Sequence, residues 1–232
     1  MLARSAKELF SGLIDYAGLF PPAALSMADA VRNYDAYRTG EHAWMLGRFI
    51  VPLAKIAEVP GDYPIAFVAP LIEIAGNDVV YVETGDIDML AERGLRAKIR
   101  TGGVTNDAFP PAAQIAHFIN RCAERGVPFK ATAGLHHPIR CVKPLTYEPD
   151  APTGTMHGFV NVFMAAALPQ YAEAIVMEAD ARAFEFGDDA ASWRGHSVTT
   201  EAIARVRSDF AISFGSCSFE EPIADLKELG WL

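Results

Sequence analysis

The sequence predicts an α/β protein that folds as one (β/α)8 barrel over residues 1–232. Short apolar runs alternate with helical segments along the chain, and eight such runs are present, as a barrel requires. A length of 232 residues suits a single barrel domain. A doubly wound open sheet is the main alternative. No G-x-G-x-x-G motif follows the early strands, which weakens a dinucleotide-binding form of that fold.

The predicted elements follow from hydrophobic pattern, capping residues and turn residues. Strands are predicted at residues 13–17, 45–51, 65–69, 78–83, 96–101, 127–133, 183–187 and 210–215. Helices are predicted at residues 26–38, 86–93, 110–125, 153 or 155 to 180, 199 or 200 to 208, and 220–229. Ser26 is a typical N-cap and Gly126 a typical helix stop, and Pro169 should interrupt the long helical region. The segment 52–77 is short, so we expect one or two outer helices to be reduced or missing.

Composition limits the cellular compartments and the kinds of partner that we expect for this protein. A net charge of −9 argues against a nucleic-acid surface or an anionic membrane surface. The three cysteines lack CxxC spacing, which is typical of a reduced protein without a disulfide framework. The N-terminus lacks the apolar core of a signal peptide, and no run of 18 apolar residues occurs. We therefore expect a cytoplasmic protein with a small-molecule partner, and a homo-oligomer stays open.

Polar side chains recur at one parity on several predicted strands. Side chains of a barrel strand alternate between the interior and the helix layer, and catalytic residues lie at the strands' C-terminal ends. This alternation predicts an interior mouth lined by charged residues, and they are Asp15, Arg48, Glu83, Lys98, Arg100 and Lys130. An internal ion-pair network is the competing interpretation, although charges in a core are an expensive source of stability.

Lys130 is the predicted nucleophile. A lysine kept neutral by burial and by a neighbouring cation attacks carbonyl carbon and forms a Schiff base. Lys98, on the adjacent predicted strand, is the expected neighbouring cation, and Arg100 is expected to bind a substrate carboxylate or phosphate. Glu83 or His136 is expected to transfer protons.

The segment Phe129-Lys-Ala-Thr-Ala-Gly134 resembles the sixth-strand segment of deoxyribose-phosphate aldolase and related class I aldolases. The resemblance covers about six residues and the strand count. It implies a Schiff-base lysine at Lys130, followed by a Thr/Ser-rich stretch and glycine. The second lysine that this family carries on strand seven has no match here, because Phe184-Glu-Phe-Gly187 stands in its place.

His136 and His137 follow a glycine turn and belong to a loop at the predicted catalytic face. Either one can act as a general acid or base near neutral pH. Together with Glu83 or Asp15, they form an alternative metal site. An ordinary hydrogen-bonded loop pair is the non-functional interpretation, and no H-E-x-x-H motif is present.

Several small residues near strand ends are predicted to contact substrate. They are Thr132, Gly102, Gly103, Gly215 and Ser216. Backbone N–H groups after the last barrel strands often hold phosphate. Ser216 and Ser218 equally suit the capping of a helix that starts near Glu220.

The sequence therefore favours an aldolase-like lyase that acts on a small anionic carbonyl compound through a lysine Schiff base, without a cofactor. Two alternatives remain. One is a metal-dependent lyase, isomerase or hydrolase that uses His136, His137 and a carboxylate, and the other is a non-catalytic barrel that binds a metabolite.

Overall fold

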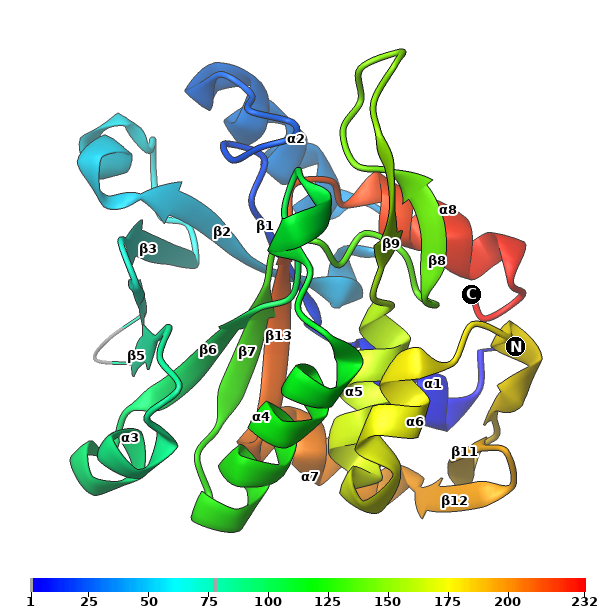
Figure 1. Cartoon of the computed structure of the whole chain (residues 1–232). Coiled ribbons are helices and arrows are strands. Elements are labelled where there is room, and N and C mark those ends of the chain that lie inside the picture. The colour runs from blue at the N-terminus through cyan, green and yellow to red at the C-terminus, as the bar shows by residue number, and fades with distance from the viewer. Residues whose placement is uncertain (1, 77–78) are drawn as a thin grey trace.

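Eight strands close into a barrel at the centre of the molecule (Figure 1). The computed structural model describes residues 2–76 and 79–232. The barrel strands, in chain order, are β1 (Ile14–Tyr16), β2 (Leu46–Pro52), β3 (Ile65–Ala69), β4 (Ile72–Ala75), β5 (Val79–Val82), β6 (Arg96–Arg100), β7 (Phe129–Thr132) and β13 (Ala211–Ser216). Around the barrel they run β1-β13-β7-β6-β5-β4-β3-β2.

The predicted closed barrel of eight strands is confirmed, and the open-sheet alternative is wrong. The prediction of parallel strands throughout is wrong as well, because β4 runs antiparallel to both β3 and β5. All other neighbouring pairs are parallel. Asp78, the first residue of the predicted fourth strand, lies outside the described residues.

The predicted seventh barrel strand, residues 183–187, is not part of the barrel. The eighth strand of the barrel is instead β4, which lies in a segment where no strand was predicted. Residues Phe184–Phe186 form β10, which pairs with β11 (Ala190–Trp193) in an antiparallel sheet that also contains β12 (His196–Thr199). A short turn between β10 and β11 favours this local hairpin over a distant parallel partner.

Helices surround part of the barrel, and most predicted helices are present. They are α1 (Arg4–Phe10), α2 (Met27–Thr39), α3 (Ile87–Arg93), α4 (Ala112–Arg125), α5 (Phe159–Ala167), α6 (Ala172–Met177), α7 (Thr200–Asp209) and α8 (Glu220–Glu228). The Ser26 hydroxyl accepts the Asp29 N–H at the start of α2. Gly126 ends α4 in the left-handed conformation, at φ 63°. Both capping predictions are therefore confirmed.

The long helix predicted from residue 153 or 155 begins later than expected. Residues Thr153–Met156 form β9, which pairs with β8 (Cys141–Pro144) in an antiparallel hairpin. The helical region starts at Phe159 in α5, ends at Ala167 before Pro169, and resumes as α6. The interruption at Pro169 is thus confirmed, whereas Thr153 and Thr155 are strand residues and cap no helix.

Within residues 2–76 and 79–232, the α-helices pack closely on only part of the barrel. α2 packs against β2, α3 and α4 against β6, and α5 and α7 against β13. Between β2 and β3 the chain forms only a short 3₁₀ helix, η2 (Leu53–Glu58). On β4, Ile72 and Ile74 point outward and are 40% and 38% exposed. This agrees with the expectation that outer helices are reduced in this segment.

The barrel interior has an apolar part and an ionic part. Ile50, Ala66, Ala75 and Tyr81 form a small apolar cluster that is separate from the large core between barrel and helices. Charged side chains from several strands lie next to this cluster and are described below. No helix within residues 2–76 and 79–232 is long and apolar enough to cross a membrane.

Candidate active site

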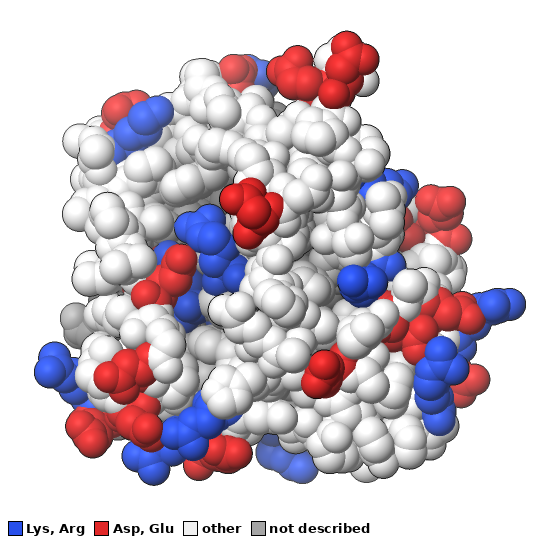
Figure 2. Space-filling view, in the orientation of Figure 1, with Lys and Arg blue, Asp and Glu red and all other residues white. Residues whose placement is uncertain are grey.

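A cavity of about 280 Å³ opens at the C-terminal ends of the parallel strands. Its walls come from six of the barrel strands and from the loops that follow β1, β6, β7 and β13. Figure 2 shows a hollow near the middle of this face, in which Lys and Arg side chains are visible beside acidic ones. The apolar wall consists of Ala17, Phe20, Pro21, Pro22, Ile50, Val68 and Val104. The cavity thus combines an apolar wall with a cationic one.

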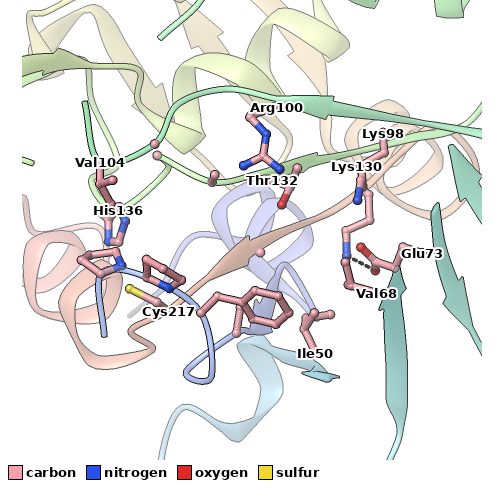
Figure 3. A pocket seen from close by; sticks show the side chains of 18 residues that line it. Ile50, Val68, Glu73, Lys98, Arg100, Val104, Lys130, Thr132, His136 and Cys217 are labelled. Atoms are coloured by element: carbon pink, nitrogen blue, oxygen red, sulfur yellow. Dashed lines mark hydrogen bonds and ion pairs between the residues drawn. The ribbon is translucent and has the colours of Figure 1, made fainter. Parts of the chain in front are cut away.

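Lys98 and Lys130 are neighbours across β6 and β7, as predicted. Their Cα atoms pair in the parallel register, and both side chains line the cavity. Figure 3 shows them together at one end of the cavity, while His136 and Cys217 lie at the other end. Both lysines are almost fully buried, with 4% exposure for Lys98 and 1% for Lys130. The two amines therefore meet inside the barrel.

Lys130 is held by two carboxylates. Its Nζ donates to Asp15 Oδ2 at 2.6 Å and to Glu73 Oε1 at 2.5 Å. All three side chains are at most 2% exposed. Burial alone would lower the pKa of Lys130, but the two carboxylates outweigh it and raise the pKa above its ordinary value. Lys130 is consequently a protonated amine in this structure.

Asp15 is fixed from three directions. Besides Lys130, the Ser213 hydroxyl donates to Oδ2 at 2.6 Å and the Arg48 backbone N–H donates to Oδ1 at 2.7 Å. Burial tends to raise the pKa of Asp15, yet the Lys130 charge and these hydrogen bonds lower it below the ordinary value. A Cβ on Gly47 would lie 2.3 Å from Asp15 Oδ1, so a glycine is needed where β2 passes this carboxylate.

Glu73 is a site residue that sequence reasoning missed. It lies on β4 and points inward, whereas its neighbours Ile72 and Ile74 point outward. The alternation Ile-Glu-Ile is itself a strand signal. However, the rule that apolar side chains point inward predicts buried isoleucines and an exposed glutamate. Nothing in the sequence indicates that a buried lysine lies within hydrogen-bonding distance of Glu73.

Lys98 has looser partners than Lys130. Glu83 Oε2 lies 3.6 Å from Lys98 Nζ, while Glu83 Oε1 accepts from Arg100 Nε at 3.3 Å. Burial is the main cause that lowers the pKa of Lys98. The carboxylates of Glu73 and Glu83 oppose this shift, and the positive charges of Lys130 and Arg100 add to it. Lys98 also lines a second cavity, next to α4, so its amine lies between two openings.

The surroundings of the two lysines are therefore the reverse of those expected. We expected a neutral Lys130 beside a cationic Lys98. The structure instead pairs Lys130 with two carboxylates and lowers the pKa of Lys98. The difference arises because Glu73, on β4, binds Lys130. This strand was not predicted from the sequence.

Arg48 does not act as the interior cation that was expected. The β1–β2 register is irregular between Ile14 and Tyr16, which breaks the strict alternation used to place Arg48. Its side chain forms no ion pair with the described residues and does not line the cavity. Its contribution to the site is the backbone N–H that binds Asp15.

The predicted substrate-contact residues divide into two groups. Arg100, Thr132, Gly103 and Gly215 line the cavity. Gly102 and Ser216 lie beside it. A Cβ on Gly102 would come within 2.4 Å of the Phe109 ring, so that glycine permits packing instead. The Ser216 side chain is buried and accepts from the Ser218 N–H at 3.4 Å, and Ser218 Oγ accepts the Glu221 N–H at 3.1 Å, as expected for serines at a helix start.

The two histidines lie on the loop after β7 and contact α8. His136 Nδ1 is 2.9 Å from Glu221 Oε2, and His137 Nδ1 is 2.6 Å from Asp225 Oδ2. Glu83 contacts Lys98 and Arg100 instead, so the three predicted metal ligands do not converge. Across the described part of the chain, no group of three or more His, Cys, Asp or Glu residues is placed to hold a metal ion.

The fold and the cavity define an α/β protein with a closed, mixed eight-stranded β-barrel and a charged pocket at one end. No protein-family model, curated protein or solved structure matches the chain. Arguments about its function therefore depend on the geometry of the pocket.

Proposed function

We propose that this protein is an aldolase-like lyase that acts on a small anionic carbonyl compound, with Lys98 as the Schiff-base nucleophile. The observation that carries the proposal is the pair of buried lysines, one held protonated by two carboxylates and the other with a lowered pKa. A desolvated amine beside a fixed cation is the arrangement that makes lysine nucleophilic at neutral pH. The local resemblance of residues 129–134 to class I aldolases agrees with the reaction class, although it implies the Schiff base at Lys130 and not at Lys98.

Burial and the charges of Lys130 and Arg100 lower the pKa of Lys98, whereas the carboxylates and a bound anion favour its protonated form, so the amine must lose a proton before it acts as a nucleophile. Asp15, Glu73 and Glu83 face Lys98, Lys130 and Arg100, so the set is balanced when all six are ionised. An anionic substrate near Arg100 brings one further negative charge. Lys130 and Arg100 remain cationic in either case, and Arg100, with a side chain 53% exposed, is accessible to a carboxylate or phosphate.

The reaction would proceed in balanced steps. The Lys98 amine attacks the carbonyl carbon, a C–N bond forms, and the carbonyl oxygen leaves as water. The resulting iminium withdraws the electron pair of the bond between the α and β carbons of the substrate, and this bond breaks as the enamine double bond forms to the α carbon. Glu83 lies near Lys98 Nζ and can accept or return the proton of the amine. A cavity of about 280 Å³ lies near the lower limit of small-ligand sites, about 300 Å³, so the substrate is small.

Borohydride trapping tests the proposal. The protein is incubated with a panel of keto acids and sugar phosphates, reduced with borohydride, and digested for peptide mass spectrometry. We expect a reduced adduct on Lys98 and none in K98R, because a guanidinium keeps the charge but cannot form the imine. Exposed Lys143 supplies the matched control, and K143R should keep the adduct.

Other outcomes have distinct meanings. An adduct on Lys130 would restore the original assignment of the nucleophile and overturn its assignment to Lys98. Failure of every carbonyl compound to give an adduct would remove the covalent mechanism.

The non-catalytic, metabolite-binding barrel is a second candidate, and one observation favours it. Lys130 is fully engaged in ion pairs, as a structural role would require. Saturable binding of a carbonyl compound by calorimetry, without any trapped adduct, would support this candidate over the lyase.

A further inference from the structure

His136 lies at the end of the cavity opposite the lysines (Figure 3), where it pairs with the carboxylate of Glu221. His136 comes from the loop after β7 and lines the cavity, and Glu221 comes from the first turn of α8. His136 Nδ1 lies 2.9 Å from Glu221 Oε2, and the two side chains are only 11% and 29% exposed. Two elements far apart in the sequence thus build one partly buried pair.

This contact fixes the tautomer of a neutral His136. A carboxylate only accepts hydrogen bonds, so Nδ1 must carry the proton that Glu221 binds. The other ring nitrogen, Nε2, makes no hydrogen bond to the described residues. It therefore keeps a free electron pair on a side chain that lines the cavity. An unprotonated imidazole nitrogen in a reaction cavity is a general base.

Glu221 is itself held in place and ionised. Its backbone N–H donates to Ser218 Oγ at 3.1 Å, and the Tyr147 hydroxyl donates to Oε2 at 3.3 Å. Burial tends to raise the pKa of Glu221, but the hydrogen bonds from His136 and Tyr147 lower it, as do the charges of the two histidines when these are protonated. Its position in the first turn of α8 also suits a negative charge.

We propose that Glu221 is a positioning residue that holds His136 as the base for the substrate hydroxyl, and this rests on the proposed lyase function. During C–C cleavage, His136 Nε2 takes the hydroxyl proton and the oxygen forms a carbonyl. The bonding electrons pass to the iminium on Lys98 as the enamine forms. The substrate class is accordingly a hydroxylated carbonyl compound with its hydroxyl at the His136 end and its carbonyl at the Lys98 end.

The adjacent histidine supplies a matched control. His137 Nδ1 binds Asp225 Oδ2 at 2.6 Å, again on α8, and its side chain is 9% exposed. His137 does not line the cavity that contains the two lysines. The two pairs share residue type, loop and helix, and Glu221 Oε1 also lies 4.0 Å from His137 Nε2. Of the two histidines, only His136 lines the cavity.

Long-range ¹H–¹⁵N spectra of ¹⁵N-histidine protein test the proposal without any substrate. At a pH where His136 is neutral, we expect its Nδ1 signal at the position of a protonated nitrogen, with H136Q used for assignment. In E221A the Nδ1 signal should move towards the unprotonated position, whereas D225A should leave His136 unchanged and alter His137.

The result that overturns the proposal is equally specific. The proposal is overturned if neutral His136 of the wild-type protein carries its proton on Nε2. This measurement uses the wild type alone and does not depend on the folding of E221A. The proposal is also overturned if the His136 Nδ1 signal is unchanged in E221A, or if it shifts as much in D225A as in E221A. Borohydride trapping should still label Lys98 in E221A, because the imine forms at the other end of the cavity. Suppose that the wild type shows the Nδ1-protonated tautomer of His136 but gives no borohydride adduct on Lys98. The proposed lyase function would then be rejected, whereas the His136–Glu221 pair would stand.

Discussion

At the scale of single residues, Lys130 is the best-defined charge in the molecule. It is buried, and each of its two partner carboxylates is also buried. Such an ion pair contributes little net stability compared with apolar residues, but removal of one partner leaves uncompensated charges in the interior. The carboxylates of Asp15 and Glu73 thus keep Lys130 protonated, and they make the barrel interior sensitive to the loss of this lysine.

This sensitivity leads to a stability prediction. We expect K130M to lower the free energy of unfolding by about 3–5 kcal/mol, because Asp15 and Glu73 lose their shared cation. Urea denaturation monitored by circular dichroism measures the change. The triple variant with D15N and E73Q should recover much of the loss, since it removes the unpaired charges.

Lys98 is the internal comparison for that experiment. K98M should cost clearly less than K130M, because Glu83 keeps its contact with Arg100. Equal costs for the two variants would mean that Lys98 is bound as tightly as Lys130, and its proposed role as the free amine would then fail.

At the scale of elements, β2 approaches β1 at a glycine. A Cβ on Gly47 would meet Asp15 Oδ1 at 2.3 Å and the Gly12 carbonyl oxygen at 3.3 Å. Neither atom can move easily, because Asp15 is fixed by three hydrogen-bond donors. The irregular β1–β2 register therefore depends on a residue without a side chain.

Substitution of this glycine should be destabilising. We expect G47A to lower the free energy of unfolding by about 1–3 kcal/mol through steric overlap. Gly85 is the matched control, because a Cβ there would meet no atom within 4 Å. Thermal unfolding of the two variants separates them, and equal stability of G47A and G85A would contradict the close approach to Asp15.

At the scale of the whole molecule, the barrel is unevenly supported. Helices pack against β2, β6 and β13, whereas β4 exposes Ile72 and Ile74 to solvent. The neighbouring η2 segment has no buried residue. Elements with few buried apolar contacts open at lower free energy than the rest of a fold.

Native-state hydrogen exchange should detect this asymmetry. We expect backbone amides of β3 and β4 to exchange through openings of much lower free energy than amides of β7 and β13. Mass spectrometry of peptides from each strand measures the difference. Equal protection on both sides of the barrel would show that it opens only as one unit.

The sequence by itself predicted a closed barrel with seven of its eight strands, most helices, and the meeting of Lys98 with Lys130. These depend on periodicity and capping, which are local, and on the adjacency of successive parallel strands. It also placed His136 on a loop at the C-terminal end of the barrel strands, where this side chain lines the cavity.

Only the tertiary structure decided which charges surround each of the two lysines. Glu73 reaches Lys130 from an antiparallel strand whose inward and outward faces are reversed relative to the hydrophobic rule. Glu221 reaches His136 from 85 residues further along the chain. The pKa of a side chain depends on the charges and burial around it in space, and short-range sequence pattern carries no record of partners so distant in the chain.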